Sequence, residues 1–439
     1  MSASEYYVDP SKQTRTPVAI SNATTTATVT QVGHGYTTGD TIKIHNAVES
    51  AYNGYWVIAN VTTDTYDYTM SSDPGGSATG SPVASKMNLA GDDGSTDALA
   101  YADLQYAINT LTQNTADGDV IYIKRGTKEV LAEDLSFSSF TPSYQYPAAF
   151  IGYSQEKTDE GVAEIDFNGF DNPFGLYLLH RNIYYHNGGT NGITLWFANN
   201  CWVNGSGTVL LYHVAYKCVF TNNGSGSSYG IYGQATAKMR HCHIEPGGNP
   251  SHSLHYCDRD QITNCTYLIR PDVTSLPPRI LNLGGYDYHS FSNNSLLNES
   301  SVSVKGVQGG STSFGTPCAG NIYEGFSTAV EQLGTSEPKL YAGFDAFFDN
   351  TTNRGSETVL VDWAAETDDV LSESPYKKEG EIVLQDFYDN NATFWASREA
   401  YFATKDIGEV QSRGVFFPYK GAIEPTPINA SPKHPLGRF

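Results

Sequence analysis

A cysteine recurs in one local setting through the middle of the chain, where it opens a short β-prone apolar run that soon meets a Gly, Asn or Pro turn. Subtracting neighbouring positions gives steps of 17, 24 and 23 residues. A small residue that returns to one internal position is typical of a solenoid, in which each coil of chain stacks on the coil before it. The pattern therefore predicts stacked strands with an internal ladder of cysteines. The ladder consists of Cys201, Cys218, Cys242 and Cys265.

A different pattern occupies the N-terminal region, where apolar and polar residues alternate over short runs separated by Gly and Asn turns. Alternation with period two predicts strands that bury one face. We expect a polar extended arm over residues 1–16 and a small β-barrel or sandwich over 17–70. The predicted strands of this domain cover residues 26–32, 41–44, 55–58 and 65–68.

A change in composition marks the next domain boundary. Residues 71–90 are rich in Gly, Ser and Pro, which predicts a linker. One amphipathic helix follows, because Leu104, Ile108 and Leu111 fall on one helical face, and Thr96 is its predicted cap. The coil pattern then covers residues 91–345, and 346–439 are expected to form a C-terminal β region and tail.

Two segments resemble known families. Residues 33–40, together with Tyr52-Asn53-Gly54 and Tyr66-Asp67-Tyr68, resemble a small β-domain of bacteriophage tail and other virion proteins. Residues 92–96, the helix and 118–127 resemble the entrance of the right-handed parallel β-helix of pectate-lyase-like proteins. These resemblances imply an all-β chain in which a barrel or sandwich precedes a parallel β-helix, with the helix plugging the first coil.

Composition narrows the classes of partner. The chain has 26 Lys and Arg against 47 Asp and Glu, a formal net charge of −21, so no basic stripe for nucleic acid is expected. The cysteines number 6, and the ladder places four inside the coils, so we expect no disulfide framework. No charged-then-apolar leader and no long apolar run is present, so we expect neither export by a leader nor membrane insertion.

Candidate chemistry is sparse. An enzyme acting on polysaccharide would need converging carboxylates, for which Glu245, Asp258 and Asp260 are the candidates if the protein is catalytic. The alternative interpretation is that these three acids lie on a solvent-exposed outer face of the coils and have no catalytic role. The Trp-Ile-Asp-His type of signature of the lyase family is absent, so the resemblance implies the fold and not the activity.

A second cluster holds His241, Cys242 and His243, with His252, His255 and Cys257 further along. Its spacing fits no standard zinc pattern. We expect Cys242 inside the ladder and the histidines on the solvent side, and we predict neither a metal nor a cofactor.

The combined hypothesis is a non-catalytic virion structural protein of a tailed phage, as capsid decoration, head fibre or tail appendage. It would assemble in the host cytoplasm and attach to other virion proteins through its N-terminal arm or domain. By resemblance to other spikes, a homotrimer is expected. The alternatives are a tailspike-like polysaccharide depolymerase, and an adhesin for host surface glycan. Its candidate sugar contacts are Trp196, Trp202 and Tyr212.

Overall fold

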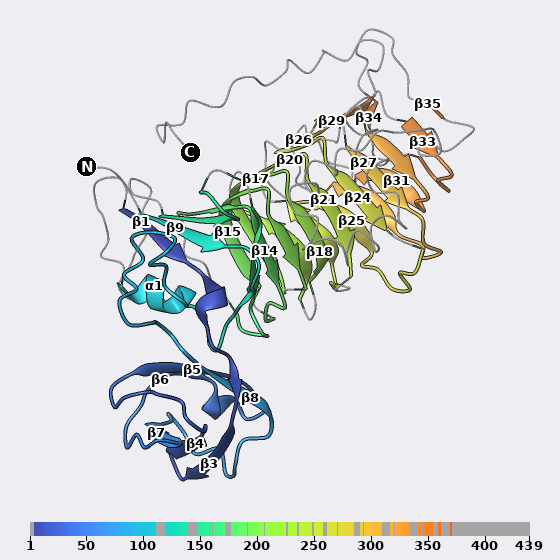
Figure 1. Ribbon diagram of the computed structural model, residues 1–439. Coiled ribbons are helices and arrows are strands. Elements are labelled where there is room, and N and C mark those ends of the chain that lie inside the picture. The colour runs from blue at the N-terminus through green and yellow to red at the C-terminus, as the bar shows by residue number, and fades with distance from the viewer. Residues whose placement is uncertain are drawn as a thin grey trace.

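The computed structural model of the chain shows a small β-barrel joined to a long right-handed parallel β-helix, with the helix α1 (Leu104–Thr110) at the end nearest the barrel (Figure 1). The described residues run from 4 to 370, and the longest gaps are 111–118, 138–147, 310–316, 333–340 and 361–368. The predicted fold class is confirmed. Most of the predicted C-terminal region lies outside the described residues.

The small domain has two antiparallel sheets, in the orders β2-β8-β5-β6 and β3-β4-β7. Backbone hydrogen bonds in both directions between Ala59 and Asp67, at 2.8 and 2.9 Å, and one from Ala78 to Ile20 at 3.0 Å join the sheets into a closed barrel. Alternating residues such as Val29 fill its core. The strands are β2 (Thr16–Pro17), β3 (Ala19–Ala23), β4 (Thr26–Thr30), β5 (Thr41–Ala47), β6 (Gly54–Val57), β7 (Thr65–Thr69) and β8 (Gly80–Lys86).

Strand β8 lies inside the predicted linker, so the linker prediction is wrong over residues 80–86. The strand pairs with β5 over most of its length and with β2 at Val83 and Ala84. Its Gly-Ser-Pro start has low intrinsic strand propensity, but pairing on two sides outweighs local preference. The barrel therefore extends about as far as Lys86.

The predicted N-terminal arm contains β1 (Ser4–Val8), which is the first strand of the β-helix and pairs in parallel with β9 (Asp119–Lys124). The chain enters the β-helix, leaves it to form the barrel, and returns. The segment before α1 covers the other edge of β1, where Tyr7 donates to the Gly94 carbonyl at 2.9 Å and accepts from Tyr101 at 2.9 Å. The first coil therefore presents no open edge at β1.

Helix α1 begins at Leu104, too far along the chain for Thr96 to be its N-cap. Asp103 caps it instead, because its carboxylate accepts from the Tyr106 amide at 3.0 Å. Thr96 serves the preceding turn, where its hydroxyl accepts from the Leu99 amide at 3.2 Å. Leu104 and Ile108 are fully buried in the β-helix core, so the helix closes the end of that core, whereas Leu111 lies outside the described residues.

One long sheet of the β-helix has 11 parallel strands in chain order. Each strand adds one rung, and where the side chains are described, alternate residues such as Ile165 and Val203 point into the core. We call it the first sheet. It consists of β10 (Glu129–Val130), β12 (Ala163–Asp166), β14 (Ile183–His186), β16 (Trp202–Asn204), β18 (Val219–Asn223), β21 (His243–Pro246), β24 (Thr266–Ile269), β27 (Ser295–Asn298), β30 (Ile322–Glu324), β33 (Ala346–Phe348) and β35 (Asp369–Val370).

The opposite sheet divides at β17 (Val209–Tyr216), whose first half pairs with β19 and whose second half pairs with β20. Later rungs therefore have three strands each. Before the division lie β1, β9, β11 (Ala148–Tyr153), β13 (Leu178–Arg181) and β15 (Ile193–Asn199). One branch is β19 (Tyr229–Gly233), β22 (Ser253–Cys257), β25 (Arg279–Leu283), β28 (Lys305–Gly309) and β31 (Thr328–Gln332), and the other is β20 (Lys238–Arg240), β23 (Gln261–Thr263), β26 (Ser290–Ser292), β29 (Pro317–Ala319), β32 (Tyr341–Gly343) and β34 (Val359–Leu360).

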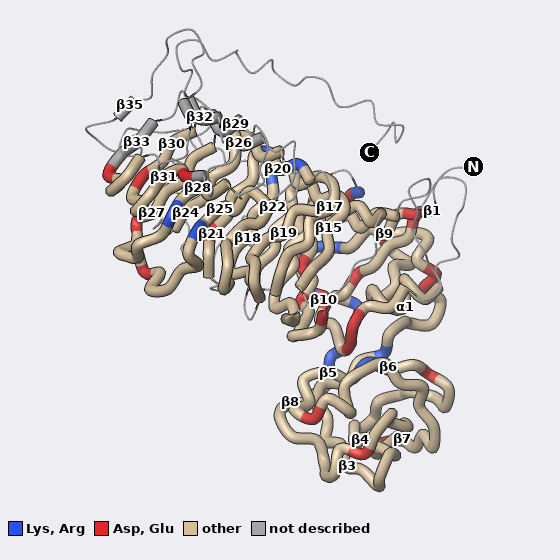
Figure 2. Tube along the Cα trace, turned by 180° about the vertical axis from the view of Figure 1, so that it is seen from behind, with Lys and Arg blue, Asp and Glu red and all other residues tan. Residues whose placement is uncertain are grey.

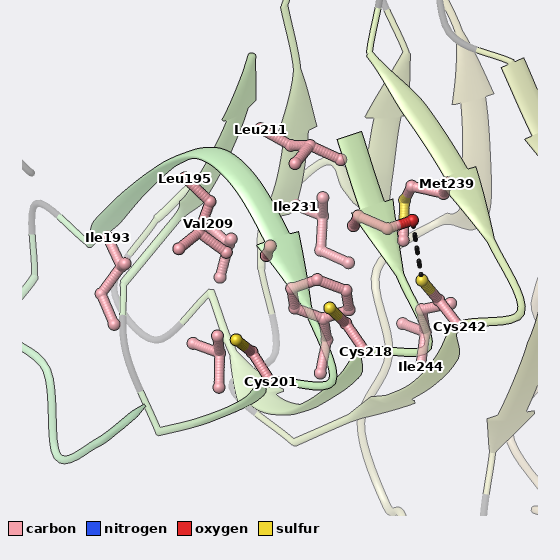
Figure 3. Packing of buried hydrophobic residues seen from close by; sticks show 14 of the residues in the cluster. Ile193, Leu195, Cys201, Val209, Leu211, Cys218, Ile231, Met239, Cys242 and Ile244 are labelled. Atoms are coloured by element: carbon pink, nitrogen blue, oxygen red, sulfur yellow. Dashed lines mark hydrogen bonds between the residues drawn. The ribbon is translucent and has the colours of Figure 1, made fainter. Parts of the chain in front are cut away.

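The four cysteines lie in one internal row, immediately before successive strands of the first sheet, and all are buried as free thiols. Figure 3 shows three of them following one another through the core. The residue before each cysteine has a left-handed backbone, with φ between 52° and 55°. After Cys265 the row continues as Asn294 and Asn321, whose amides bond to each other and to neighbouring backbone. The Cys repeat therefore marks a turn that recurs on every coil.

The barrel meets the β-helix at a buried ionic junction, made by Lys43 of β5, Asp103 and Glu129 of β10. The Lys43 Nζ lies 2.7 Å from Asp103 Oδ2 and also binds Glu129 Oε1, and all three side chains are fully buried. Gln13 joins the group through a 3.1 Å bond to Glu129 Oε2. Blue and red segments face each other between β5 and β10 in Figure 2. We call Lys43, Asp103 and Glu129 the junction triad.

None of the described helices is long and apolar enough to cross a membrane.

Candidate functional site

The outer face of the first sheet carries polar and aromatic side chains on its first rungs. Parallel register places Glu164 beside Tyr184, and Tyr184 beside Trp202. A second outer row places Asp166 beside His186, and His186 beside Asn204. The residues between these rows, such as Ile165 and Tyr185, are buried in the core, as strand alternation requires.

Two carboxylates and a histidine meet at the start of these rows. The His186 Nε2 lies 2.7 Å from Glu164 Oε1 and 3.9 Å from Asp166 Oδ2. Lys128 binds Asp166 Oδ2 at 2.7 Å, and Asn187 donates to Asp166 Oδ1 at 3.0 Å. We call Glu164, Asp166, His186 and Lys128 the acidic cluster.

The two carboxylates of the acidic cluster differ in environment. Burial alone would raise the pKa of Asp166, but the hydrogen bond from Lys128 and the charge of His186 outweigh it and lower that pKa. Asp166 is therefore held ionised. The side chain of Glu164 is 21% exposed against 8% for Asp166, so Glu164 is the carboxylate that solvent can reach.

Residues two apart on a strand are separated by about 7 Å, which falls in the range that carboxylate pairs of inverting glycosidases span. In such a pair one carboxyl group serves as acid and the other as base. That spacing refers to the Cα atoms of Glu164 and Asp166, and the His186 ring lies within 2.7 Å of one carboxylate and 3.9 Å of the other. The ionised Asp166 would suit the base of such a pair.

Aromatic rings continue the first row away from the acidic cluster. Tyr184 stacks on His186 with centroids 4.8 Å apart, and its ring packs at a tilt against Trp202 with centroids 4.7 Å apart. The Trp202 indole donates to the Thr221 hydroxyl at 2.7 Å. Because Tyr184 and Trp202 are buried, these rings support the cluster and leave no open face for a ligand.

The predicted sugar contacts differ in exposure. Trp202 is 2% exposed and Trp196 is 8% exposed, with the Trp196 ring packed against Tyr177 and His213. Tyr212 is half-buried beside the register shift between β15 and β17. The burial of both indoles argues against the predicted contacts at the tryptophans, because their faces already pack on neighbouring rings.

Of the three predicted acids, the structure describes Glu245. It lies on the same outer face, where its carboxylate is 2.6 Å from His243 Nε2, and both side chains are buried. Strands β12 and β21 are four rungs apart, so Glu245 lies about 19 Å from the acidic cluster. That distance prevents the two groups from acting on one bond. Asp258 and Asp260 lie outside the described residues.

The His and Cys residues considered for a metal do not converge. His255 points into the core, where its Nδ1 bonds to the Tyr267 hydroxyl at 2.7 Å, and Cys257 is buried in the same core. His243 faces outward on another sheet, and His241 occupies the turn before Cys242. Among the described residues, no three His, Cys, Asp or Glu side chains are placed to hold a metal ion.

The sequence contains a pattern that points to the acidic cluster. The run Ala163-Glu164-Ile165-Asp166 alternates in the way that places both acids outside one strand. The histidine follows in Tyr184-Tyr185-His186, which is the next rung. To place His186 beside the two acids, one must know the register between these neighbouring coils. Both coils precede Cys201, so the cysteine spacing does not give that register.

No protein-family model and no curated protein matches this chain. Among solved structures, an alginate lyase from Paenibacillus is 14% identical, with 61% of this chain and 95% of that one covered and a TM-score of 0.32. The pectin methylesterase from Aspergillus niger is 12% identical, covering 65% and 89%, with a TM-score of 0.29. An α-1,3-glucanase from Streptomyces thermodiastaticus is 9% identical, covering 81% and 87%, with a TM-score of 0.27. At these scores the likenesses carry no argument about what this chain does.

Proposed function

We propose that this chain is a virion structural protein of a tailed phage, which projects its β-helix from the particle and attaches through the barrel. The observation that carries the proposal is the junction triad. A buried cation shared by two buried carboxylates joins the barrel to the β-helix, and we infer that it holds the two parts in a fixed orientation. Stiffness of this kind suits a projecting rod.

The surface available for attachment follows from the position of β1. Because Ser4–Val8 is paired within the β-helix, it is not a free arm. Three valines of the small domain remain strongly exposed: Val32 at 82%, Val48 at 73% and Val57 at 66%. With β1 unavailable, the barrel is the part of the N-terminal region that remains for attachment, and we assign attachment to it.

Electron cryo-microscopy of the intact particle tests this proposal. We expect ordered copies on the capsid or tail, with the barrel against a neighbouring virion protein and the β-helix directed outward. The same map gives the number of copies in each projection, which we propose to be three. Absence of the chain from the purified particle would reject the structural role.

A second candidate function is a polysaccharide depolymerase, which the acidic cluster favours. Replacing Glu164 by Gln and Asp166 by Asn should abolish any release of reducing ends from host surface polysaccharide. Glu245→Gln, about 19 Å away, should leave it intact. If the unmodified protein releases no reducing ends, or if the variant at Glu164 and Asp166 keeps full activity, the catalytic role of this cluster is excluded.

A further inference from the structure

Cations in most of the described chain are neutralised by nearby acids. Lys86 pairs with Asp40 at 2.8 Å, and Lys157 pairs with Glu5 at 2.8 Å. Lys305 binds Glu331 at 2.5 Å. Paired cations are the expected condition in a chain of net charge −21, where carboxylates outnumber cations.

Three cations at the division of the sheet depart from this rule. Lys217, Lys238 and Arg240 form no ion pair in the part of the chain that the structure describes, and the same holds for Arg15 and Arg279, which lie elsewhere. Lys238 and Arg240 are half-buried and Lys217 is exposed. We call these three residues, with Tyr216 and His241, the basic strip.

The register brings the strip together. Tyr216 of β17 lies beside Arg240 of β20, and two positions earlier Val214 lies beside Lys238. Because they are two apart on one strand, Lys238 and Arg240 point to the same side, opposite Met239, which is buried in the core. Figure 2 shows blue segments beside the β20 label.

The remaining members extend the strip around the turn. The Lys217 ammonium lies 5.7 Å from the centre of the Tyr216 ring, and the His241 ring stands nearly perpendicular to the Tyr216 ring, with centroids 5.6 Å apart. Adjacent strands are about 4.8 Å apart, and alternate residues of one strand are about 7 Å apart. Three positive charges and one half-buried aromatic ring therefore share a short stretch of surface.

The surroundings of His241 are positively charged. Burial lowers the pKa of His241 most, and the charges of Lys217 and Arg240 lower it further. The His241 imidazole is therefore neutral at neutral pH, and the positive charge of the strip comes from its lysines and Arg240. A bound anion would offset that positive charge.

We propose that the basic strip binds a linear acidic polysaccharide, whose carboxylate or sulfate groups pair with the three cations. Arg240 offers the planar, two-pronged geometry that suits carboxylate and sulfate oxygens. The charge of the strip complements an anionic chain, which the rest of this acidic surface would repel.

Nucleic acid is the competing anionic polymer, and the extent of the strip argues against it. Affinity for nucleic acid grows with the number of phosphates that cations neutralise, and the strip offers three cations. The acidic remainder of the surface would repel the rest of a long phosphate chain. A short charged stretch of polysaccharide fits the strip better.

The test uses the full chain and measures affinity for polygalacturonate, dextran sulfate and neutral dextran by calorimetry and by electrophoresis through gels containing each polymer. The main variant combines Lys217→Gln, Lys238→Gln and Arg240→Gln. The matched control, Lys86→Gln with Lys157→Gln and Lys305→Gln, removes the same charge elsewhere. Thermal unfolding of both variants shows whether the fold is kept.

We expect the unmodified chain to bind at least one anionic polymer and to ignore neutral dextran. The main variant should lose about tenfold or more in affinity, because three charge-assisted contacts disappear, while the control changes little. Raising the salt from about 0.05 M to about 0.5 M should weaken binding strongly, since the contacts are near the surface.

Failure to bind either anionic polymer, or equal losses in the two variants, would overturn the proposal. Binding of single-stranded DNA as tight as that of polygalacturonate, lost in the main variant, would assign the strip to phosphate polymers and would also overturn it. The experiment needs only the purified protein, so its result is separate from whether the chain is found in a virion.

Discussion

The barrel and the β-helix solve the same problem, a β-sheet with exposed edges, in different ways. The barrel closes on itself through backbone hydrogen bonds such as those between Ala59 and Asp67. The first coil of the β-helix is covered instead by β1, the segment before α1 and the helix itself. A closed domain needs nothing from its neighbour, whereas a stacked one depends on an end structure supplied from elsewhere in the chain.

The junction triad is where this dependence should have its largest effect. Lys43→Met leaves two buried carboxylates without their cation, so we expect a loss of about 3–5 kcal/mol in the free energy of unfolding. Lys86→Met, in a partly exposed pair with Asp40, should cost about 1 kcal/mol or less. Urea unfolding of both variants measures the difference. If the two variants lost equal free energy of unfolding, the junction triad would contribute no more to stability than the partly exposed pair does.

Glycines give the next comparison, because both regions contain glycine with positive φ. At Gly192 in the β-helix, φ is 84° and an added Cβ would lie 1.7 Å from the Thr208 carbonyl oxygen. At Gly39 in the barrel, φ is 94° and nothing lies within 4 Å. We expect Gly192→Ala to cost about 2–4 kcal/mol and Gly39→Ala about 1–2 kcal/mol, measured by calorimetry. If Gly39→Ala cost more stability than Gly192→Ala, neighbouring coils of the β-helix would be able to move apart to make room for the added methyl group.

The junction should also make stability depend on pH. Burial raises the pKa of Glu129 to about 7, and Lys43 offsets only part of that rise. Since the folded pKa lies above the ordinary value of 4.5, the folded state binds this proton more tightly than the unfolded state. Its contribution is complete below about pH 4.5 and is lost as pH rises through about 7.

Glu129→Gln should remove that dependence. Thermal unfolding of the variant and of the unmodified chain between about pH 5 and pH 8 isolates the effect, because every other group is common to both. We expect the difference in melting temperature to change in favour of the variant as pH rises. A constant difference across this range would show that Glu129 does not titrate there.

The smallest expected effect concerns the turn before each cysteine. His241 and Asn264 have φ values of 54° and 55°, a region that Asn tolerates and most other residues do not. His241→Gly should therefore raise stability by about 0.5–1 kcal/mol, while Asn264→Gly should be near neutral. Chemical unfolding compares the two. An equal gain at both positions would mean that Asn brings no advantage to this turn.

The repeating core was predictable from sequence because cysteine occupies the same turn position on four successive coils. Each cysteine precedes a strand of the first sheet, so the spacing of the cysteines gives the lengths of successive coils. The same reasoning missed the continuation at Asn294 and Asn321, where the residue type changes from a thiol to an amide. The backbone position is kept, and the amides satisfy the hydrogen bonds of that turn.

Other features depend on contacts that no local pattern reveals. Strand β8 begins with Gly80-Ser81-Pro82, which favours a turn until β5 and β2 pair with it. Asp103 caps α1 in preference to Thr96 and also binds Lys43 from 60 positions away. The acidic cluster needed the register of two neighbouring coils. Alternation identifies which side a carboxylate faces, and only the fold shows which histidine lies beside it.

The route of the chain through β1 has a mechanical consequence. The barrel is tied to the β-helix by two covalent connections, one leaving β1 and one returning after β8. A body held by a single strand can swivel about that strand, whereas two tethers and a buried cation between them resist twisting. Torque applied to the barrel should therefore pass directly into the first coils.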